Sequence, residues 1–265
     1  MARTVQGAPA QTLLGLWLFM DGSAGDALTQ ITDLSGNGNH AILKAGWEAH
    51  APIRQSYGVE VASADGTIFE TPVAMNQPGG KLTVVIASRS TLPGLEVNVF
   101  NTLMGSSLNE VGSDPGAFLS TVPEPCLLVR GTYDPAMVKM FDDGGDIWGD
   151  QNLQGSEGDY ADHGEAGVVA FDIDAEANTV KLHSLGAPTT SAMHAGVGAH
   201  YDGSSDRGTL EIGTWARGGA RSAVSSIGQI HAAAAYADSF DPEAAQQLMA
   251  SFQRIVALRG VTYPG

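Results

Sequence analysis

Cysteine is nearly absent from this chain, since Cys126 is the only one among 265 residues. One cysteine excludes an intrachain disulfide framework and a zinc site built from several thiolates. Cys126 lies in the apolar run Pro125–Val129, where a small buried hydrophobic side chain is the usual role. The sequence therefore predicts a core residue at this position and no reactive thiol.

Positive charge is also scarce. The chain has 13 Lys and Arg against 29 Asp and Glu, which gives a formal net charge of −16 and a pI near 4.6. Binding to nucleic acid needs clustered basic side chains that neutralise phosphates. We therefore expect no nucleic-acid partner and a well-solvated acidic surface.

Long apolar runs are missing as well. None approaches the ~18 apolar residues of a membrane-spanning helix, so no membrane insertion is expected. The run from Leu13 to Met20 is apolar, but no A-x-A cleavage site follows it, and we interpret it as a strand. We expect synthesis in a cytoplasm without export, and an extracellular location is the alternative.

Glycine is what the chain has in quantity, with 34 residues, while charged residues make up only 16%. Many tight turns and buried sheet faces give this composition, and the length suits one large β-sandwich. We predict a flexible N-terminal arm over 1–12 and a single all-β domain over 13–265. Its middle region, about 89–166, is an elaboration rich in Gly, Pro and Asp.

One stretch organises the domain, and it lies between the apolar segments Leu14–Phe19 and Ala41–Leu43. Glycine and asparagine tolerate a positive φ, and short Asp and Ser side chains bond to nearby backbone N–H groups. The pattern predicts a compact turn between two buried strands. Its residues are Asp33, Ser35, Gly36, Asn37, Gly38, Asn39 and His40.

The segment Gly15–Leu43 resembles the opening of laminin-G-like domains in the concanavalin A-like lectin and glucanase superfamily, including a complete D-x-S-G-N-G-N-H turn. The closing segments Gly167–Gly186, Gly208–Gly213 and Gly228–Tyr236 follow in the order that the family shows. The resemblance implies an all-β, concanavalin A-like (laminin-G-like) jelly-roll β-sandwich with one C-terminal helix. It names no target, because the superfamily holds lectins, hydrolases and structural modules.

The C-terminal helix has its own local signals. Asp241 can cap it, Pro242 suits its first position, and Gly260 marks its end. Apolar side chains recur after Pro242 at helical spacing, which predicts packing against the sandwich. In the strands we expect nine side chains to face inward: Leu16, Phe19, Val84, Ile86, Phe171, Leu182, Ile212, Ile230 and Tyr236.

Asp172, Asp174 and Glu176 are the strongest candidates for catalysis. Three carboxylates at alternate positions resemble the acidic strand of laminarinase-like glycoside hydrolases, and retaining hydrolysis needs two carboxyls about 5–5.5 Å apart. However, the first position is Asp where that family has Glu, and Glu176 falls in an apparent hairpin turn. We therefore expect no enzymatic activity.

Two other groups could bind ligands. Asp142, Asp143, Asp146 and Asp150 offer oxygen donors that suit calcium, although their spacing is not that of an EF-hand loop and a plain acidic surface loop is the more common explanation of such a stretch. No motif requires a cofactor. Three tryptophans in loop-like stretches offer faces for stacking on sugars, with buried packing as the alternative. They are Trp47, Trp148 and Trp215.

These observations leave three functions open. The first is a non-enzymatic structural or adhesive protein of a bacteriophage virion, such as a capsid decoration, fibre or tail protein. Its partners would be other virion proteins or further copies of itself, and salt would promote its assembly. The alternative is a free carbohydrate-binding module for surface glycans, and the third is a glycoside hydrolase using Asp172, Asp174 and Glu176.

Overall fold

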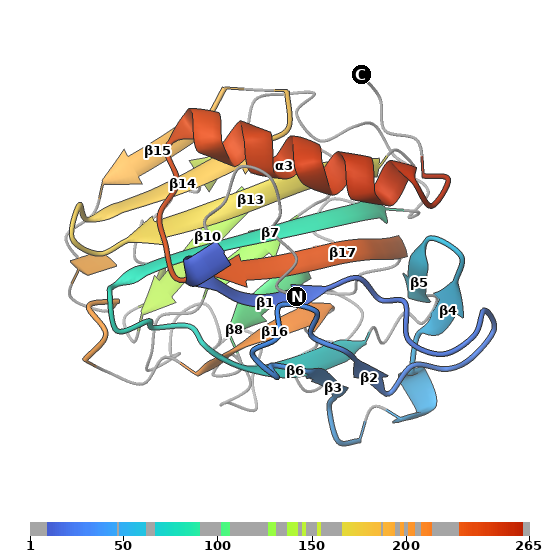
Figure 1. The fold of residues 1–265 in the computed structure, drawn as a ribbon. Helices are drawn as coiled ribbons and strands as arrows, with labels where there is room; N and C mark the ends of the chain where they lie inside the picture. Colours follow the sequence, from blue (N-terminus) through green and yellow to red (C-terminus); the bar gives the residue numbers. More distant parts are fainter. Residues whose placement is uncertain are drawn as a thin grey trace.

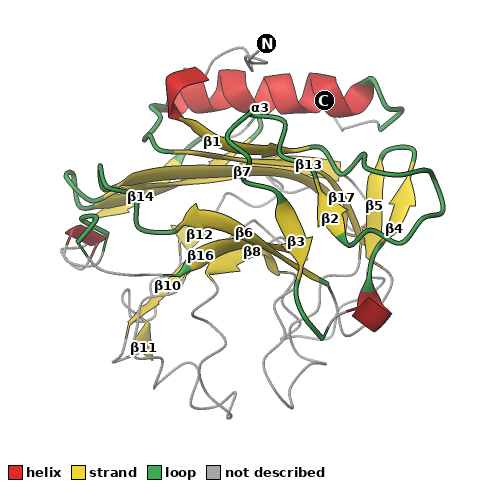
Figure 2. Ribbon diagram, turned by 60° about the horizontal axis from the view of Figure 1, so that its bottom comes forward, coloured by secondary structure: helices red, strands yellow, loops and turns green. Residues whose placement is uncertain are grey.

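The protein forms a β-sandwich covered on one side by a helix, as a computed structural model shows (Figures 1 and 2). Sheet A lies between helix α3 (Pro242–Ala257) and sheet B, so the molecule has three layers. The structure describes residues 10–46, 48–61, 67–90, 102–106, 127–130, 137–142, 145–146, 153–154, 166–186, 188–193, 197–198, 201–204, 208–213 and 228–261.

Sheet A is antiparallel and has the order β15-β14-β13-β7-β17-β5-β4, with β1 beside the C-terminal half of β17. Its long central strands β13, β7 and β17 correspond to apolar runs that the sequence predicts as strands. The bounds are β1 (Leu13–Trp17), β4 (Ile53–Gln55), β5 (Gly58–Val61), β7 (Lys81–Ser90), β13 (Ala166–Asp174), β14 (Thr179–Ser184), β15 (Thr190–Met193) and β17 (Gly228–Tyr236).

Sheet B has the order β11-β10-β9-β8-β16-β6-β3-β2, with β12 beside β10. Its bounds are β2 (Gln30–Ile31), β3 (Ala41–Leu43), β6 (Ile68–Ala74), β8 (Thr102–Ser106), β9 (Leu127–Arg130), β10 (Met137–Asp142), β11 (Gly145–Asp146), β12 (Leu153–Gln154) and β16 (Thr209–Gly213). Two 3₁₀ turns, Ala10–Thr12 and Glu48–His50, precede β1 and β4.

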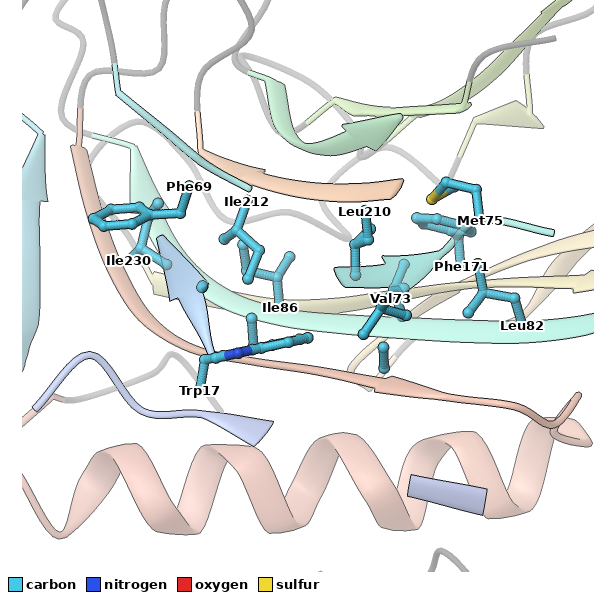
Figure 3. Packing of buried hydrophobic residues seen from close by; sticks show 14 of the residues in the cluster. Trp17, Phe69, Val73, Met75, Leu82, Ile86, Phe171, Leu210, Ile212 and Ile230 are labelled. Atoms are coloured by element: carbon cyan, nitrogen blue, oxygen red, sulfur yellow. The ribbon is translucent and has the colours of Figure 1, made fainter. Parts of the chain in front are cut away.

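The main core fills the space between the sheets (Figure 3). Phe69 and Ile212 of sheet B pack toward Ile86 and Ile230 of sheet A, because alternate residues of a strand point to the same face. Trp17 of β1 is fully buried among them, and its indole Nε1 donates a hydrogen bond to the Asn39 carbonyl oxygen at 2.8 Å. Burial of these side chains provides most of the drive to fold.

A second core lies between the outer face of sheet A and helix α3. The Asp241 carboxylate caps the helix by accepting a hydrogen bond from the Ala244 N–H at 2.8 Å, as the sequence predicts. The small residues Ala232 and Ala234 of β17 let the helix lie close to the sheet. From the helix, Leu248, Met249, Phe252 and Val256 are buried against this face.

Seven of the nine side chains predicted to face inward lie in the core between the sheets. Leu16 and Tyr236 are buried, but they belong to the second core, beneath α3. The difference has a simple cause: both faces of sheet A are covered, so an apolar residue at either face is buried.

The predicted turn after Asp33 joins β2 to β3 in sheet B, whereas β1 belongs to sheet A. The sequence places the turn correctly, but it predicts Leu14–Phe19 as the strand before the turn. The strand that precedes the turn is β2, which has no recognisable pattern because it contains only Gln30 and Ile31. The hairpin of β13 and β14 forms as predicted, with Asn178 at a φ of 53° in its turn. Within the described residues, no helix has the length and apolar character needed to cross a membrane.

Candidate functional site

A row of side chains crosses the outer face of sheet B, and we call Ile42, Lys44, Glu70 and Glu211 the carboxylate row. In the register of the sheet, Ile42 of β3 lies opposite Glu70 of β6, and Glu70 lies opposite Glu211 of β16. Their strand neighbours, such as Phe69, point into the core between the sheets, so the row points the other way.

Lys44 joins the two carboxylates. Its Nζ lies 3.1 Å from Glu70 Oε1 and 3.0 Å from Glu211 Oε1. Both oxygens therefore contact the same ammonium group. The Glu211 side chain is only 5% exposed and that of Glu70 is 45% exposed. Glu211 is thus a buried charge compensated by Lys44, while Glu70 is accessible to a ligand.

The chemistry of this row suits a molecule rich in hydroxyl groups. Charged carboxylates accept strong hydrogen bonds, and a lysine ammonium donates up to three. Ile42 is 46% exposed at the end of the row and offers apolar surface to the C–H groups of a sugar ring. The row combines polar anchors with an apolar neighbour, which is the usual composition of a small-molecule site.

The three carboxylates predicted for catalysis have other partners. Asp172 is fully buried beneath α3, where its Oδ2 accepts hydrogen bonds from the Phe240 N–H at 2.6 Å and the Thr83 hydroxyl at 2.8 Å. Its Oδ1 accepts from the Ser239 hydroxyl at 2.7 Å and lies 3.1 Å from Lys181 Nζ. This carboxylate holds the connection between β17 and α3 and has no access to solvent.

Asp174 ends β13 and Glu176 lies in the hairpin turn that follows, and both lie beside Lys81. The Lys81 Nζ is 3.2 Å from Glu176 Oε2 and 3.7 Å from Asp174 Oδ2, and the Glu176 side chain is largely exposed. These contacts raise the pKa of Lys81, chiefly through the hydrogen bond to Glu176. The acidic strand therefore provides structural contacts at two places and no open carboxylate pair.

The predicted turn is a structural site. The side-chain amides of Asn37 and Asn39 donate hydrogen bonds to the carbonyl oxygens of Leu13 and Leu14, which fastens the turn to β1. His40 Nδ1 accepts a hydrogen bond from the backbone N–H of Asp33 at 3.1 Å. Ser35 donates its hydroxyl to Asp33 Oδ2 at 2.7 Å, and Gly36 and Gly38 have φ angles of 94° and 77°.

Other predicted ligand residues lie largely outside the described residues. Asp142 ends β10 and pairs with Gly145, and Asp146 ends β11 and pairs with Phe141. Asp143, Asp150, Trp47, Trp148 and Trp215 lie outside the described part of the chain, as does Cys126. Among the residues that the structure describes, no group of His, Cys, Asp or Glu is placed to hold a metal ion. Calcium binding stays a prediction.

Two histidines are buried in sheet A and held neutral. Burial lowers the pKa of His183 to about 4, against the opposing influence of the Asp172 charge. Burial likewise lowers the pKa of His231 to about 4. His231 stacks edge to face with Tyr57, with ring centroids 5.5 Å apart. Both histidines pack in the structure and belong to no candidate site.

The carboxylate row could not be predicted from the sequence. Glu70 and Glu211 are single acids in alternating strands, which is the ordinary pattern of a solvent-facing strand position. Lys44 is separated from Glu211 by 167 residues. The sequence shows only that Glu70 and Glu211 each occupy a short apolar strand. It does not show that these two strands, β6 and β16, pair with each other.

The fold is similar to that of a Trypanosoma rangeli sialidase, with a TM-score of 0.55 and 14% identity over 94% of this chain and 34% of that one. This chain thus spans about a third of the sialidase. A Ruminococcus gnavus IT-sialidase CBM40 gives a TM-score of 0.48 and 12% identity, over 72% of this chain and 95% of that one. No protein-family model and no curated protein matches the sequence. At these identities the likeness to the sialidase shows the fold alone.

Proposed function

We propose that this chain is a carbohydrate-binding module without catalytic activity, and that it binds hydroxyl-rich sugars at the carboxylate row. The observation that carries the proposal is the position of Lys44 Nζ between Glu70 and Glu211, beside the exposed Ile42. This row is a fixed set of hydrogen-bonding groups on the rigid face of a sheet, and rigid polar groups lower the cost of ordering a ligand site.

The same contacts argue against hydrolysis at this row. Retaining hydrolysis needs one protonated carboxyl and one carboxylate. Lys44 Nζ lies between the two carboxyl groups, 3.1 Å from Glu70 Oε1 and 3.0 Å from Glu211 Oε1, and the Glu211 side chain is only 5% exposed, so the row offers no open pair of carboxyls to flank a glycosidic bond. Asp172 is buried beneath α3 with all its contacts satisfied. Binding therefore suits the described residues better than catalysis.

The fold supports a carbohydrate partner by analogy. A Trypanosoma rangeli sialidase of similar fold is known in complex with sialic acid, with a TM-score of 0.54 and 14% identity. The virion component that the sequence first suggested has no counterpart among these similar structures. Fold likeness does not establish function, so the choice rests on the row itself.

Charge decides which sugar the row favours. One lysine faces two glutamates, so the row carries a net negative charge in a chain whose formal charge is −16. An acidic sugar such as sialic acid would meet like charge there. The row therefore favours neutral sugars over acidic ones.

We further propose that the sandwich belongs to the concanavalin A-like, laminin-G-like group. The order of the turn after Asp33, the β13–β14 hairpin and β17, which is the order of that group, supports this proposal. An additional role in assembly with other copies stays a prediction.

Binding to a panel of neutral oligosaccharides and sialyllactose, measured by calorimetry, tests the function. We expect a neutral ligand to bind the wild type, and Glu70→Gln to weaken binding by about tenfold or more, since a charge-assisted hydrogen bond is lost. Glu243→Gln on α3 is the matched control, because that exposed glutamate lies across the molecule from the row.

Unchanged binding by Glu70→Gln would remove the row from the ligand site. Preference for sialyllactose would contradict the charge argument. Release of sugar products by the wild type, lost in Glu70→Gln, would replace the binding module by an enzyme.

A further inference from the structure

Arg54 is a buried cation, and two of its three side-chain nitrogens have no hydrogen-bond partner. It lies in β4, at the edge of sheet A (Figure 1), and only 7% of its surface is exposed. Its register partner Val59 is buried in the core between the sheets, so the Arg54 side chain lies on the inner face of that edge. Its Nε and Nη1 atoms are buried and have no hydrogen-bond partner.

The carboxylates on the elements around Arg54 have other hydrogen-bond partners. Asp26 Oδ2 accepts the Ser23 N–H at 2.7 Å, and Asp21 Oδ2 accepts the Thr32 N–H at 2.9 Å. Glu60 lies opposite Ile53, on the other face of the strand, and contacts the Tyr57 hydroxyl at 3.3 Å. Within the described ranges, no carboxylate forms an ion pair with Arg54.

The backbone around Arg54 is fixed on both sides. Its N–H donates to the Asp26 carbonyl oxygen at 2.8 Å, and its own carbonyl oxygen accepts from the Gly25 N–H at 2.9 Å. Leu28 N–H donates to the Pro52 carbonyl oxygen at 2.9 Å, so the segment 25–28 is bonded along β4. The backbone that carries the guanidinium is therefore fixed on both sides.

Arg54 differs from the three lysines whose side chains the structure describes. Lys44, Lys81 and Lys181 each lie within ion-pair distance of at least one carboxylate. An uncompensated buried charge is strongly unfavourable, and a chain with 29 acidic residues had ample means to compensate it. A buried guanidinium with which no carboxylate of the described residues pairs is thus the arrangement expected of a group that receives its anion from a ligand.

We propose that Arg54 anchors an oxyanion-binding site at the β4 edge of sheet A, for a carboxylate or sulfate group. The planar guanidinium has several N–H donors and matches two oxygens of such a group, and the strand that carries it is fixed by backbone hydrogen bonds. The site lies on the inner side of sheet A, whereas the carboxylate row lies on the outer face of sheet B. The two sites can therefore be tested independently.

Thermal unfolding with added anion tests the site. Sodium sulfate and sodium glucuronate are titrated at low millimolar concentration, with sodium chloride keeping the ionic strength constant. We expect the wild type to gain stability until the site saturates, with the unfolding constant falling about 100-fold when the anion reaches 100 times its Kd. A gain with both salts identifies a general oxyanion site, and a gain with glucuronate alone identifies the carboxylate of a sugar acid.

Arg54→Met is the decisive variant, since methionine keeps a long unbranched side chain at this position but removes the positive charge. We expect it to show no response to either anion and to unfold at a higher temperature than the anion-free wild type, because an uncompensated buried charge has gone. Arg254→Met on α3 is the matched control and should keep the response, as the Arg254 guanidinium bonds to Ser251 on another face of the molecule.

Three results would overturn the proposal. One is a wild type that ignores both anions. Another is an Arg54→Met protein with the wild-type response, which would place the anion elsewhere. The third is an Arg54→Met protein that unfolds at a lower temperature than the anion-free wild type, which would show that the buried guanidinium is already compensated.

Discussion

The Asp33 carboxylate accepts a hydrogen bond from the backbone N–H of Leu16 at 3.0 Å, although 17 residues separate them. Leu16 lies in β1 of sheet A, and Asp33 begins the turn that leads into β3 of sheet B. The same carboxylate accepts from the Ser35 and Asn39 N–H groups at 2.8 and 3.0 Å. One side chain therefore shapes the turn and joins it to the other sheet.

Asp33→Asn should destabilise the protein by roughly 2–3 kcal/mol, because hydrogen bonds to a charged acceptor weaken and one acceptor becomes a donor. Urea unfolding measures the change. Asp26→Asn is the control, since among the described residues that exposed carboxylate accepts a hydrogen bond only from the Ser23 N–H in its own loop. An equal loss of unfolding free energy in the two variants would show that the hydrogen bond between Asp33 and Leu16 does not stabilise the protein more than a bond within a surface loop.

Gly38→Ala should cost about 1 kcal/mol, because its φ of 77° lies in the left-handed region where a Cβ is unfavourable. No atom lies within 4 Å of the position that a new Cβ would take, so the cost is one of backbone conformation and not of crowding. Gly79→Ala is the control, since Gly79 also has free space and its φ is not in this region. We expect Gly79→Ala to leave the free energy of unfolding nearly unchanged or to raise it slightly.

Asp172→Ala should cost about 3–5 kcal/mol, because Lys181 would lose its buried partner and the Phe240 N–H would lose its acceptor. Asp241→Ala removes only the exposed helix cap and should cost about 1 kcal/mol. Denaturant unfolding of both proteins gives the comparison. If the Asp172 variant lost no more than the Asp241 variant, the buried carboxylate would not be the anchor of α3.

Stability should fall as the pH falls from about 6.5 to about 4. Burial lowers the folded-state pKa of His183 and of His231 from 6.5 to about 4, so the unfolded chain binds protons first in this range. By linkage, each histidine should remove roughly 3 kcal/mol once the pH is below about 4. Urea unfolding at a series of pH values measures the slope.

His183→Gln and His231→Gln should each flatten that slope, and together they should remove most of it. At lower pH a different group adds to the loss. Burial would raise the pKa of Asp33, but hydrogen bonds from Leu16, Ser35 and Asn39 outweigh this and lower the pKa below 3.8. Its contribution is present above that pH and is lost as acid protonates it. A free energy of unfolding that stays constant between pH 7 and pH 5 would contradict the buried neutral histidines.

Much of the local structure was determined by the sequence by itself. The positive φ of Gly36 and Gly38, the Asp241 cap and the β13–β14 hairpin follow from residue types at fixed spacing, because the contacts involved span only a few residues. The strand patterns likewise identified nine side chains that are buried in the structure. The aspartates and tryptophans predicted as ligands lie mostly outside the described residues and stay predictions.

The tertiary structure alone decided which face each buried residue occupies and which polar residues meet. Sheet A is covered on both faces, so alternation could not show that Leu16 and Tyr236 lie beneath α3. Asp172 became an anchor, and Glu70 and Glu211 became neighbours, through strand pairing between distant segments. The physical reason is that a strand's sequence specifies its alternation, while its neighbours are chosen by packing of the whole sandwich.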